Sequence, residues 1–436
     1  MLVYKDKRYG IFHVGTIYLV LSLIDTYIPS ILWITGNQSA RPPWLAPFSN
    51  SEISLGLINY TIFYSIMILT LMAFPKTNIK KWIGSYNVEN IYLKKKLHIF
   101  LIITGCMFLI QLMYEINSYG GYSEWLFQKF SYRFNKGIKT YSLLERFLYF
   151  IPWRNLFDTL VYVCFLYRYR FRNPKVYGIV LPIISVVLAL TTSHRGSILL
   201  FLIGLFFVES IRVYIHKKNN YDSSFGVGRE SIYKPKYFIL SIMLIGVFLL
   251  YGAVRTAIEN EAKGNESTGT SVIYSVLNQG SGLQGISSVI KRYGNDLDFL
   301  LGKTYIDMML LPIPRSIYTS KPITYGIQDI SLDMGWTGRD GRVSNEAAIT
   351  LPGEAYANFG WFGLTIALLY GTFFGLIIRF IHNMGGIYIV LYPTVVIPVI
   401  FMSNWMSFTG TMNRLLPSLI IFFMLFIISI KIYKTR

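Results

Sequence analysis

An apolar run of about 40 residues, from Val176 to Ile215, constrains the fold of this chain more than any other feature. Its only charged residues are Arg195, Glu209 and Arg212. As one α-helix the run would be about 60 Å long, twice the thickness of the hydrocarbon core of a bilayer. The run therefore predicts two antiparallel membrane spans. The polar stretch TTSHRGS at 191–197 is the segment suited to the turn between them.

The composition places the whole chain in the same class. Of its 436 residues, 53% are hydrophobic and 14% are charged, whereas soluble domains carry roughly 25% charged residues. We predict one all-α polytopic membrane domain, 1–436, with about ten transmembrane helices. The predicted spans lie at 11–35, 53–74, 97–114, 147–167, 176–192, 197–215, 237–256, 355–379, 387–406 and 414–431. The first has no signal-peptide cleavage site, so we expect it to remain as a span.

Basic residues indicate which side of the membrane each loop faces. The short loops 36–52 and 407–413 hold Arg41 as their one Lys or Arg, whereas the alternate loops are rich in both. The positive-inside rule then predicts that both termini are cytoplasmic. TTSHRGS and the large loop 257–354, between spans seven and eight, are predicted to be extracytoplasmic. The net charge of +19 is assigned to the inner loops and anionic lipid, not to nucleic acid.

Cysteine and histidine give no indication of a metal or a cofactor. Cys106 and Cys164 both lie in apolar windows, where we expect buried residues without a disulfide or a thiolate metal site. Of the histidines, only His194 is predicted to lie plainly on the extracytoplasmic side, so no metal site can be assembled there. His194 is interpreted either as a turn residue without chemistry or as a catalytic group.

Four arginines are predicted near the outer face: Arg154, Arg195, Arg255 and Arg315. Arginine at membrane depth is costly and usually faces a cavity or an anionic partner. A guanidinium group matches phosphate oxygens, so these residues are candidates for an anion-binding site. Two structural alternatives stay open, namely contact with lipid phosphates and, for Arg154, an ion pair with Asp158 four residues on.

The stretch LPGEAYANFGWFG, 351–363, closes the large loop and opens the predicted eighth span. Glu354 is interpreted either as a first-turn acid that satisfies free N–H groups or as a general base. Within the loop, the residues 288–310 are amphipathic, and three prolines interrupt 309–322. The polar segment 326–350 resembles a lid. Tyr318, Tyr325 and Trp336 are candidates for stacking on sugar rings.

Three stretches together resemble bacterial oligosaccharide repeat-unit polymerases, the Wzy-type O-antigen and capsule polymerases. They are SHRGSILL, LPIPRSIYTSKP and GEAYANFGWFG. The resemblance implies a membrane glycosyltransferase (GT-C-like) architecture without a metal, acting on the outer face of the bacterial inner membrane. It also implies undecaprenyl-diphosphate-linked oligosaccharides as substrates, membrane lipids and a chain-length regulator as partners, and diphosphate binding by Arg195, Arg255 and Arg315. Tyr356 and Asn358 become candidate glycan-binding residues.

Such a reaction needs a base for the acceptor hydroxyl. Glu354 is the first candidate, followed by Asp340, Glu346 and His194. The nearest rival function is an O-antigen ligase, a family expected to carry a histidine in the large loop, and 257–354 contains none. A flippase or transporter is expected to concentrate charges midway through its spans, and a peptidoglycan-type polymerase is a third alternative.

Overall fold

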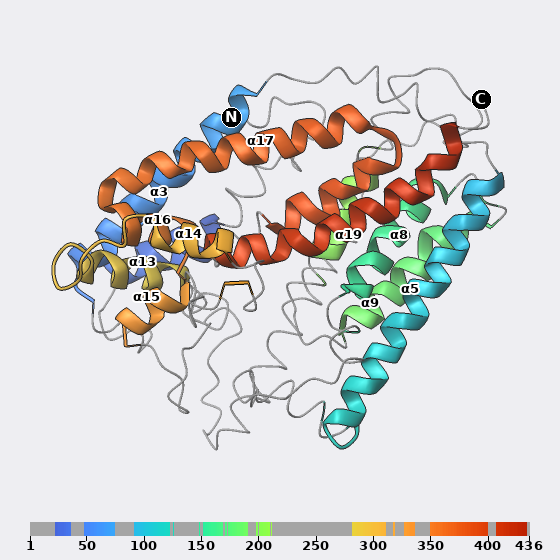
Figure 1. Ribbon diagram of the computed structural model, residues 1–436, viewed down its shortest axis with the longest axis horizontal. Helices are drawn as coiled ribbons and strands as arrows, with labels where there is room; N and C mark the ends of the chain where they lie inside the picture. The colour runs from blue at the N-terminus through green and yellow to red at the C-terminus, as the bar shows by residue number, and fades with distance from the viewer. Residues whose placement is uncertain are drawn as a thin grey trace.

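The computed structural model is mostly helical in its described part, which contains no β-strand. It describes residues 22–35, 48–74, 91–122, 125, 148, 151–168, 171, 173–190, 198, 200–209, 211, 281–310, 317–318, 327–335, 349–399 and 407–433. The main helices are α2 (Ile28–Thr35), α3 (Asn50–Ala73), α5 (Ile91–Ser118), α8 (Trp153–Leu166), α9 (Leu181–Leu190), α13 (Ser281–Arg292), α14 (Lys303–Leu310), α15 (Ile327–Asp333), α16 (Leu351–Phe359), α17 (Ile366–Met384) and α19 (Phe408–Tyr433) (Figure 1). Short π or 3-10 segments adjoin them, namely η3 (Leu23–Tyr27), η6 (Val176–Val180), η8 (Gly360–Thr365), η9 (Gly386–Val390) and η10 (Tyr392–Val396).

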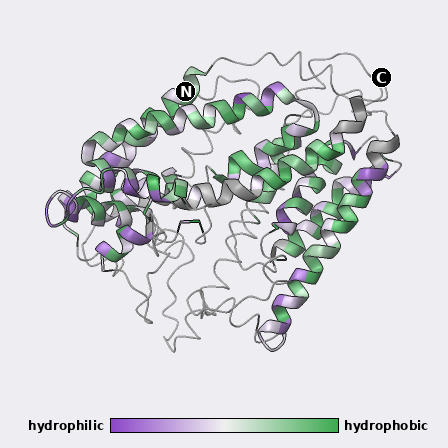
Figure 2. Ribbon diagram, in the orientation of Figure 1, coloured by the Kyte–Doolittle hydropathy of each residue, from purple (hydrophilic) through white to green (hydrophobic). Residues whose placement is uncertain are grey.

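Three described helical stretches are long and apolar enough to cross a membrane. They are α3, Lys95–Ser118 of α5, and Leu351–Met384, of which α17 is the long part. Hydrophobic residues dominate these helices, while hydrophilic residues gather where α13, α14 and α15 lie (Figure 2). The chain is therefore an all-α protein with membrane-spanning helices. The predicted span at 237–256 lies outside the described residues.

The apolar run from Val176 folds back on itself, as its length requires. A side chain on Gly178, near its start, would lie 2.8 Å from Cδ of Arg168. Glu209, near its other end, accepts a hydrogen bond from the same arginine at 2.8 Å. Both ends of the run thus meet Arg168, just beyond the C-terminus of α8 (Trp153–Leu166). The turn itself, 191–197, lies outside the described residues.

The two cysteines differ in their surroundings. Cys164 is fully buried in α8, as predicted. Cys106 is exposed on α5, and the prediction of a buried residue is wrong there. Its neighbours Ile102, Ile103 and Leu109 are exposed as well, so this side of the spanning helix forms an apolar outer surface. A window of hydrophobic residues cannot distinguish such a face from a core-facing one.

Helices α3 and α17 pack side by side and run in the same direction. The ring centroids of Phe63 and Tyr370 lie 6.0 Å apart, and one turn further a side chain on Gly371 would meet the Met67 carbonyl oxygen at 2.6 Å. Glycine at this contact lets the two backbones approach closely, as small residues do in membrane helix pairs.

The chain reverses direction between α16 and α17, so the predicted span 355–379 is not one continuous helix. Gly360, with φ of 57°, ends α16. The 3-10 turn η8 then returns over α16, so that a side chain on Gly363 would lie 2.3 Å from the carbonyl oxygen of Ala355. The result is a helical hairpin whose first arm, from Leu351 to Asn358, is buried.

Replacement of Gly363 by alanine tests this hairpin. The new methyl group would overlap the Ala355 carbonyl, a backbone atom that cannot move aside as a flexible side chain can. We expect a loss of about 3 kcal/mol of stability or more, read as a lower Tm in detergent. Gly105→Ala is the matched control, because its nearest contact is the Phe157 ring at 3.3 Å. Equal Tm values for the two variants would contradict the hairpin.

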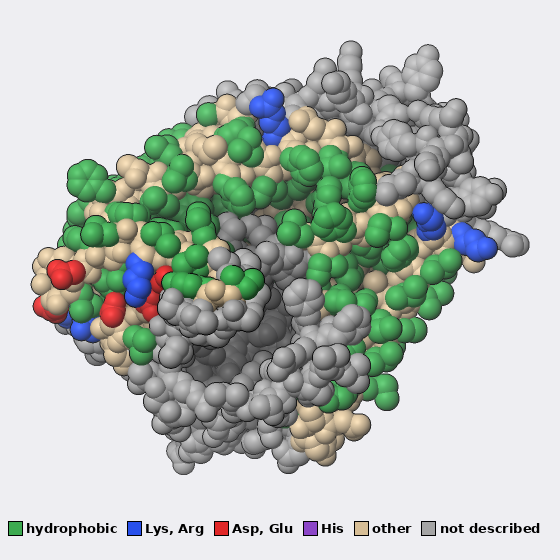
Figure 3. Space-filling model, in the orientation of Figure 1, with side chains coloured by type: hydrophobic (Ala, Val, Ile, Leu, Met, Phe, Trp, Pro, Cys, Tyr) green, Lys and Arg blue, Asp and Glu red, His purple; other side chains and the backbone are tan. Residues whose placement is uncertain are grey.

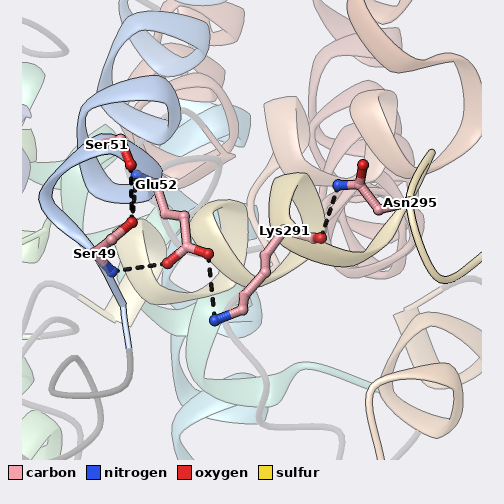
Figure 4. Close-up of polar contacts among 5 residues, drawn as sticks. All are labelled: Ser49, Ser51, Glu52, Lys291 and Asn295. Atoms are coloured by element: carbon pink, nitrogen blue, oxygen red, sulfur yellow. Dashed lines mark hydrogen bonds and ion pairs between the residues drawn. The ribbon is translucent and has the colours of Figure 1, made fainter.

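The helices that precede the hairpin in sequence pack beside the first half of α3. Ser49 and Glu52 form a capping box at the start of α3, and Glu52 also pairs with Lys291 of α13 at 3.2 Å (Figure 4). Four residues further along α3, a side chain on Gly56 would lie 2.7 Å from Ser287 Oγ. The helix α13 therefore lies against α3 along its side, and together with α16 it forms one packed unit.

Candidate functional site

Charged side chains gather at one end of the molecule, where α13, α14 and α15 meet (Figure 3). The long helices show mainly hydrophobic side chains in the same view. Five of the predicted site residues lie in the described part, and they are Arg154, Tyr318, Glu354, Tyr356 and Asn358. His194, Arg195, Arg255, Arg315, Tyr325 and Trp336 lie outside it, as do Asp340 and Glu346.

Glu354 lies in the first turn of α16 and is 0% exposed. Its Oε2 accepts a hydrogen bond from the backbone N–H of Phe408, the first residue of α19. A carboxylate at this point satisfies a free N–H group and interacts favourably with the positive end of the helix dipole. Glu354 thus caps the N-terminus of α19, whereas the sequence suggested this role for the helix that contains Glu354 itself.

Glu354 lies beside helices that are long and apolar enough to span a membrane. The Phe408 ring lies 5.4 Å from that of Tyr370, which contacts Phe63 near the middle of α3. A carboxylate buried in such surroundings is costly unless it is paired or hydrogen-bonded. Its position next to spanning helices makes it the described ionisable group with the strongest claim to a function.

Two tyrosines accompany Glu354, and the sequence did not single them out. The hydroxyls of Tyr305 on α14 and Tyr370 on α17 are buried. They interact with each other, and the negative charge of Glu354 acts on both. Burial, and then the negative charge of Glu354, raises the pKa of Tyr305 well above its usual range. The phenol therefore remains protonated and can donate a hydrogen bond. No local motif marks these residues, because they come from separate helices.

Asn358 joins α14 to the hairpin. Its amide nitrogen donates to Thr304 Oγ1 and to the Glu354 carbonyl, each at 2.8 Å. Its Oδ1 accepts from the Gly302 N–H at 3.0 Å. The Asn358 side chain is 0% exposed. Its hydrogen bonds hold the start of α14 against α16, the helix that carries Glu354.

The two described tyrosines predicted to bind the glycan lie in different environments. Tyr356 is buried between two aromatic residues, with its ring centroid 6.1 Å from Phe299 and 5.8 Å from Trp361. Tyr318 is partly exposed beside Ile317. The environment of Tyr356 is that of a packing residue, and of the two Tyr318 has the more accessible ring.

Arg154 occupies the first turn of α8, nearer the helix end than predicted. Its Nε lies 3.6 Å from Asp158 Oδ2, the i,i+4 pair that the sequence left open as an alternative. Asp158 also accepts a hydrogen bond from Ser185 of α9. The arginine is thus part of the packing between α8 and α9.

No family model, curated protein or solved structure matches this chain. The site therefore has to be interpreted from its own chemistry. Within the part of the chain that the structure describes, no group of three or more His, Cys, Asp or Glu side chains could hold a metal ion. The chemistry available around Glu354 is that of a fixed carboxylate with phenol donors, which suits transfer of a proton from a hydroxyl group.

A second pair of acids, not predicted from the sequence, joins α14 to α15. Asp307 and Asp329 are both largely buried, and Lys303 Nζ lies 3.4 Å from Asp329 Oδ2. Burial, and then the negative charge of Asp329, raises the pKa of Asp307, while Lys303 acts in the opposite direction. One further polar contact links α15 to the residue that follows α13. The Tyr293 hydroxyl donates a hydrogen bond to Asp333, the last residue of α15, at 2.7 Å.

Replacement of Asp307 by asparagine should stabilise the protein at neutral pH. A raised pKa means that the folded state binds the proton more tightly than the unfolded state, so the charged acid opposes folding above its folded-state pKa. That penalty declines as the pH falls through this pKa towards the ordinary value of 3.8. We expect a gain of about 1 kcal/mol at pH 7 that shrinks in acid, measured by unfolding at several pH values. Asp298→Asn, at an exposed site, is the control, and a pH-independent effect would contradict the prediction.

Proposed function

We propose that this chain polymerises undecaprenyl-diphosphate-linked oligosaccharide repeat units on the outer face of the bacterial inner membrane. The observation that carries the proposal is Glu354, a fully buried carboxylate held by the Phe408 N–H, whose charge acts on the buried hydroxyls of Tyr305 and Tyr370. An ionisable residue buried beside spanning helices is by default a functional candidate. An acceptor hydroxyl on a lipid-linked sugar is presented close to the membrane, where such a base could reach it.

The sequence supplies positive groups that could bind the negatively charged diphosphates of the substrates. Arg195, Arg255 and Arg315 are proposed to bind the diphosphates of the donor and acceptor lipids. As the glycosidic bond to the carrier breaks, its electrons stay with the diphosphate oxygen, where negative charge develops. Fixed guanidinium groups stabilise such a charge without a metal. Glu354 takes the proton of the acceptor hydroxyl, whose oxygen forms the new bond to the anomeric carbon.

The buried charges elsewhere favour this function over a transporter. Two described ion pairs in the bundle lie towards the two ends of α8. Arg154 in its first turn pairs with Asp158 in its second, and Arg168, just beyond its last turn, pairs with Glu209. A transport pathway would instead place charges midway through several spans. Glu354, by contrast, lies in the first turn of the short helix α16 and is fully buried.

Deletion of the gene, followed by gel analysis of surface polysaccharide, tests the proposal. Single repeat units in place of a ladder are the expected result. Polymer that accumulates on its lipid carrier would indicate a ligase instead. Lipid-linked units that accumulate facing the cytoplasm would indicate a flippase. An unchanged ladder would contradict the polymerase function.

A further inference from the structure

One side of α14 and of the turn before it is apolar and exposed, although neither belongs to a spanning helix. Leu301 and Met309 are each 77% exposed and Ile306 is 58% exposed. The opposite side of α14 is buried, with Thr304 and Asp307 facing the protein. A soluble surface seldom concentrates apolar side chains on one short element, so a surface of this kind indicates a partner.

The backbone at Leu301 is strained, and this strain keeps the leucine outward. Its φ of 48° lies in the left-handed region, which costs a residue with a side chain roughly 1 kcal/mol. The conformation lets successive N–H groups of the turn bond to the end of α16. The Leu300 and Leu301 N–H groups donate to the carbonyls of Ala357 and Asn358, each at 3.0 Å. Asparagine or glycine would adopt it more readily, so a leucine here points to a use for its apolar side chain.

The exposed residues adjoin the apolar outer surface of α17. Leu301 is bonded to Asn358, at the end of the hairpin where Trp361 and Phe362 lie. Phe362 is 83% exposed, and exposed apolar residues continue along the spanning helix with Leu369 and Phe373. The exposed Leu301 thus lies next to the turn at which the exposed apolar residues of α17 begin.

The direction of α14 carries this surface toward the membrane interior. It begins at Lys303, beside the hairpin turn, and the Tyr305 ring lies 5.5 Å from Phe408 at the start of α19 (Figure 1). Ile306 and Met309 follow in the same direction. A lysine at the outer end with apolar residues beyond it is the pattern of a helix in a membrane interface.

We propose that Leu301, Ile306 and Met309 insert among the acyl chains of the membrane leaflet, so that α14 anchors the helices next to Glu354 to the lipid. The partner is bilayer lipid, because Leu301 adjoins the turn where the exposed apolar residues of the spanning helix α17 begin. The anchor would fix the height at which the hairpin and Glu354 stand relative to the bilayer. This inference is independent of the reaction that the protein catalyses.

Fluorescent labels in reconstituted protein test the anchor. In a Cys106→Ser, Cys164→Ser background, an environment-sensitive dye is attached at Leu301→Cys, Ile306→Cys or Met309→Cys in phospholipid nanodiscs. We expect blue-shifted emission and quenching by doxyl-labelled lipids, strongest for Met309 and weakest for Leu301. Leu369→Cys, on the exposed side of α17, is the membrane control. Asp296→Cys, at an exposed acid between α13 and α14, is the aqueous control.

Labels at the three positions that behave like the one at Asp296 would overturn the proposal. A second measurement needs no substitution and so does not depend on the variants folding. Hydroxyl-radical oxidation in nanodiscs should spare Met309 to the same extent as Met113, which is 68% exposed on the spanning helix α5. Extensive oxidation of Met309 with Met113 protected would equally contradict insertion.

Discussion

Replacement of Glu354 by glutamine is expected to abolish polymer formation while the protein still folds. The amide keeps an oxygen that can accept the Phe408 N–H bond, so the contact between α16 and α19 is retained. It removes the group able to take a proton, and loss of a general base typically lowers a rate by about 10² to 10⁴-fold. Polymer length on a gel and transfer with purified lipid-linked units measure the effect.

Glu354→Ala separates the structural contribution from the chemical one. Alanine leaves the buried Phe408 N–H without this acceptor, which we expect to cost roughly 1.5–3 kcal/mol because the lost bond is to a charged group. The alanine variant should therefore be both inactive and less stable, and the glutamine variant only inactive. Full activity of the glutamine variant, with a lower Tm for alanine, would show that Glu354 serves only to cap α19.

Alanine at Arg195, Arg255 or Arg315 is expected to abolish the ladder while the protein still inserts in the membrane. Each change removes a positive group from the developing charge on the diphosphate, an effect of about 10² to 10³-fold for one electrostatic stabiliser. Lysine should restore part of the activity, because it keeps the charge but not the two-pronged geometry of arginine. Gel ladders together with the amount of membrane-inserted protein measure the outcome.

Arg379→Ala is the matched control for these variants. Arg379 is exposed near the C-terminal end of α17, away from the hairpin turn, and its loss should leave the ladder intact. A normal ladder in all three test variants would rule out diphosphate binding by these arginines. Loss of the ladder in the control as well would indicate a general effect of removing positive charge.

Much of the helical architecture could be predicted because it depends on length and hydropathy. The run from Val176 is too long for one span, and both of its ends do meet Arg168. The hairpin at Gly360 could not be predicted in the same way. The apolar pattern continues through α16 into α17, and the reversal depends on one backbone conformation that composition does not reveal.

The candidate site was likewise predictable only in part. Glu354 was identified as an acid at the start of a helix, a local pattern. Its actual partner is Phe408, 54 residues away in the sequence. Tyr305 and Tyr370 went unnoticed, because a tyrosine in an apolar protein has no distinguishing neighbours until helices bring its hydroxyl close to a carboxylate.

The sequence by itself determined that the chain is an all-α membrane protein and that the run from Val176 must turn back, since hydrocarbon thickness limits the length of a span. It also drew attention to Glu354. Only the tertiary structure decided that this acid caps α19, that the chain folds back over α16 after Gly360, and that α14 presents Leu301, Ile306 and Met309 outward. Those outcomes depend on which helices pack together, and packing is set by contacts between residues far apart in the chain.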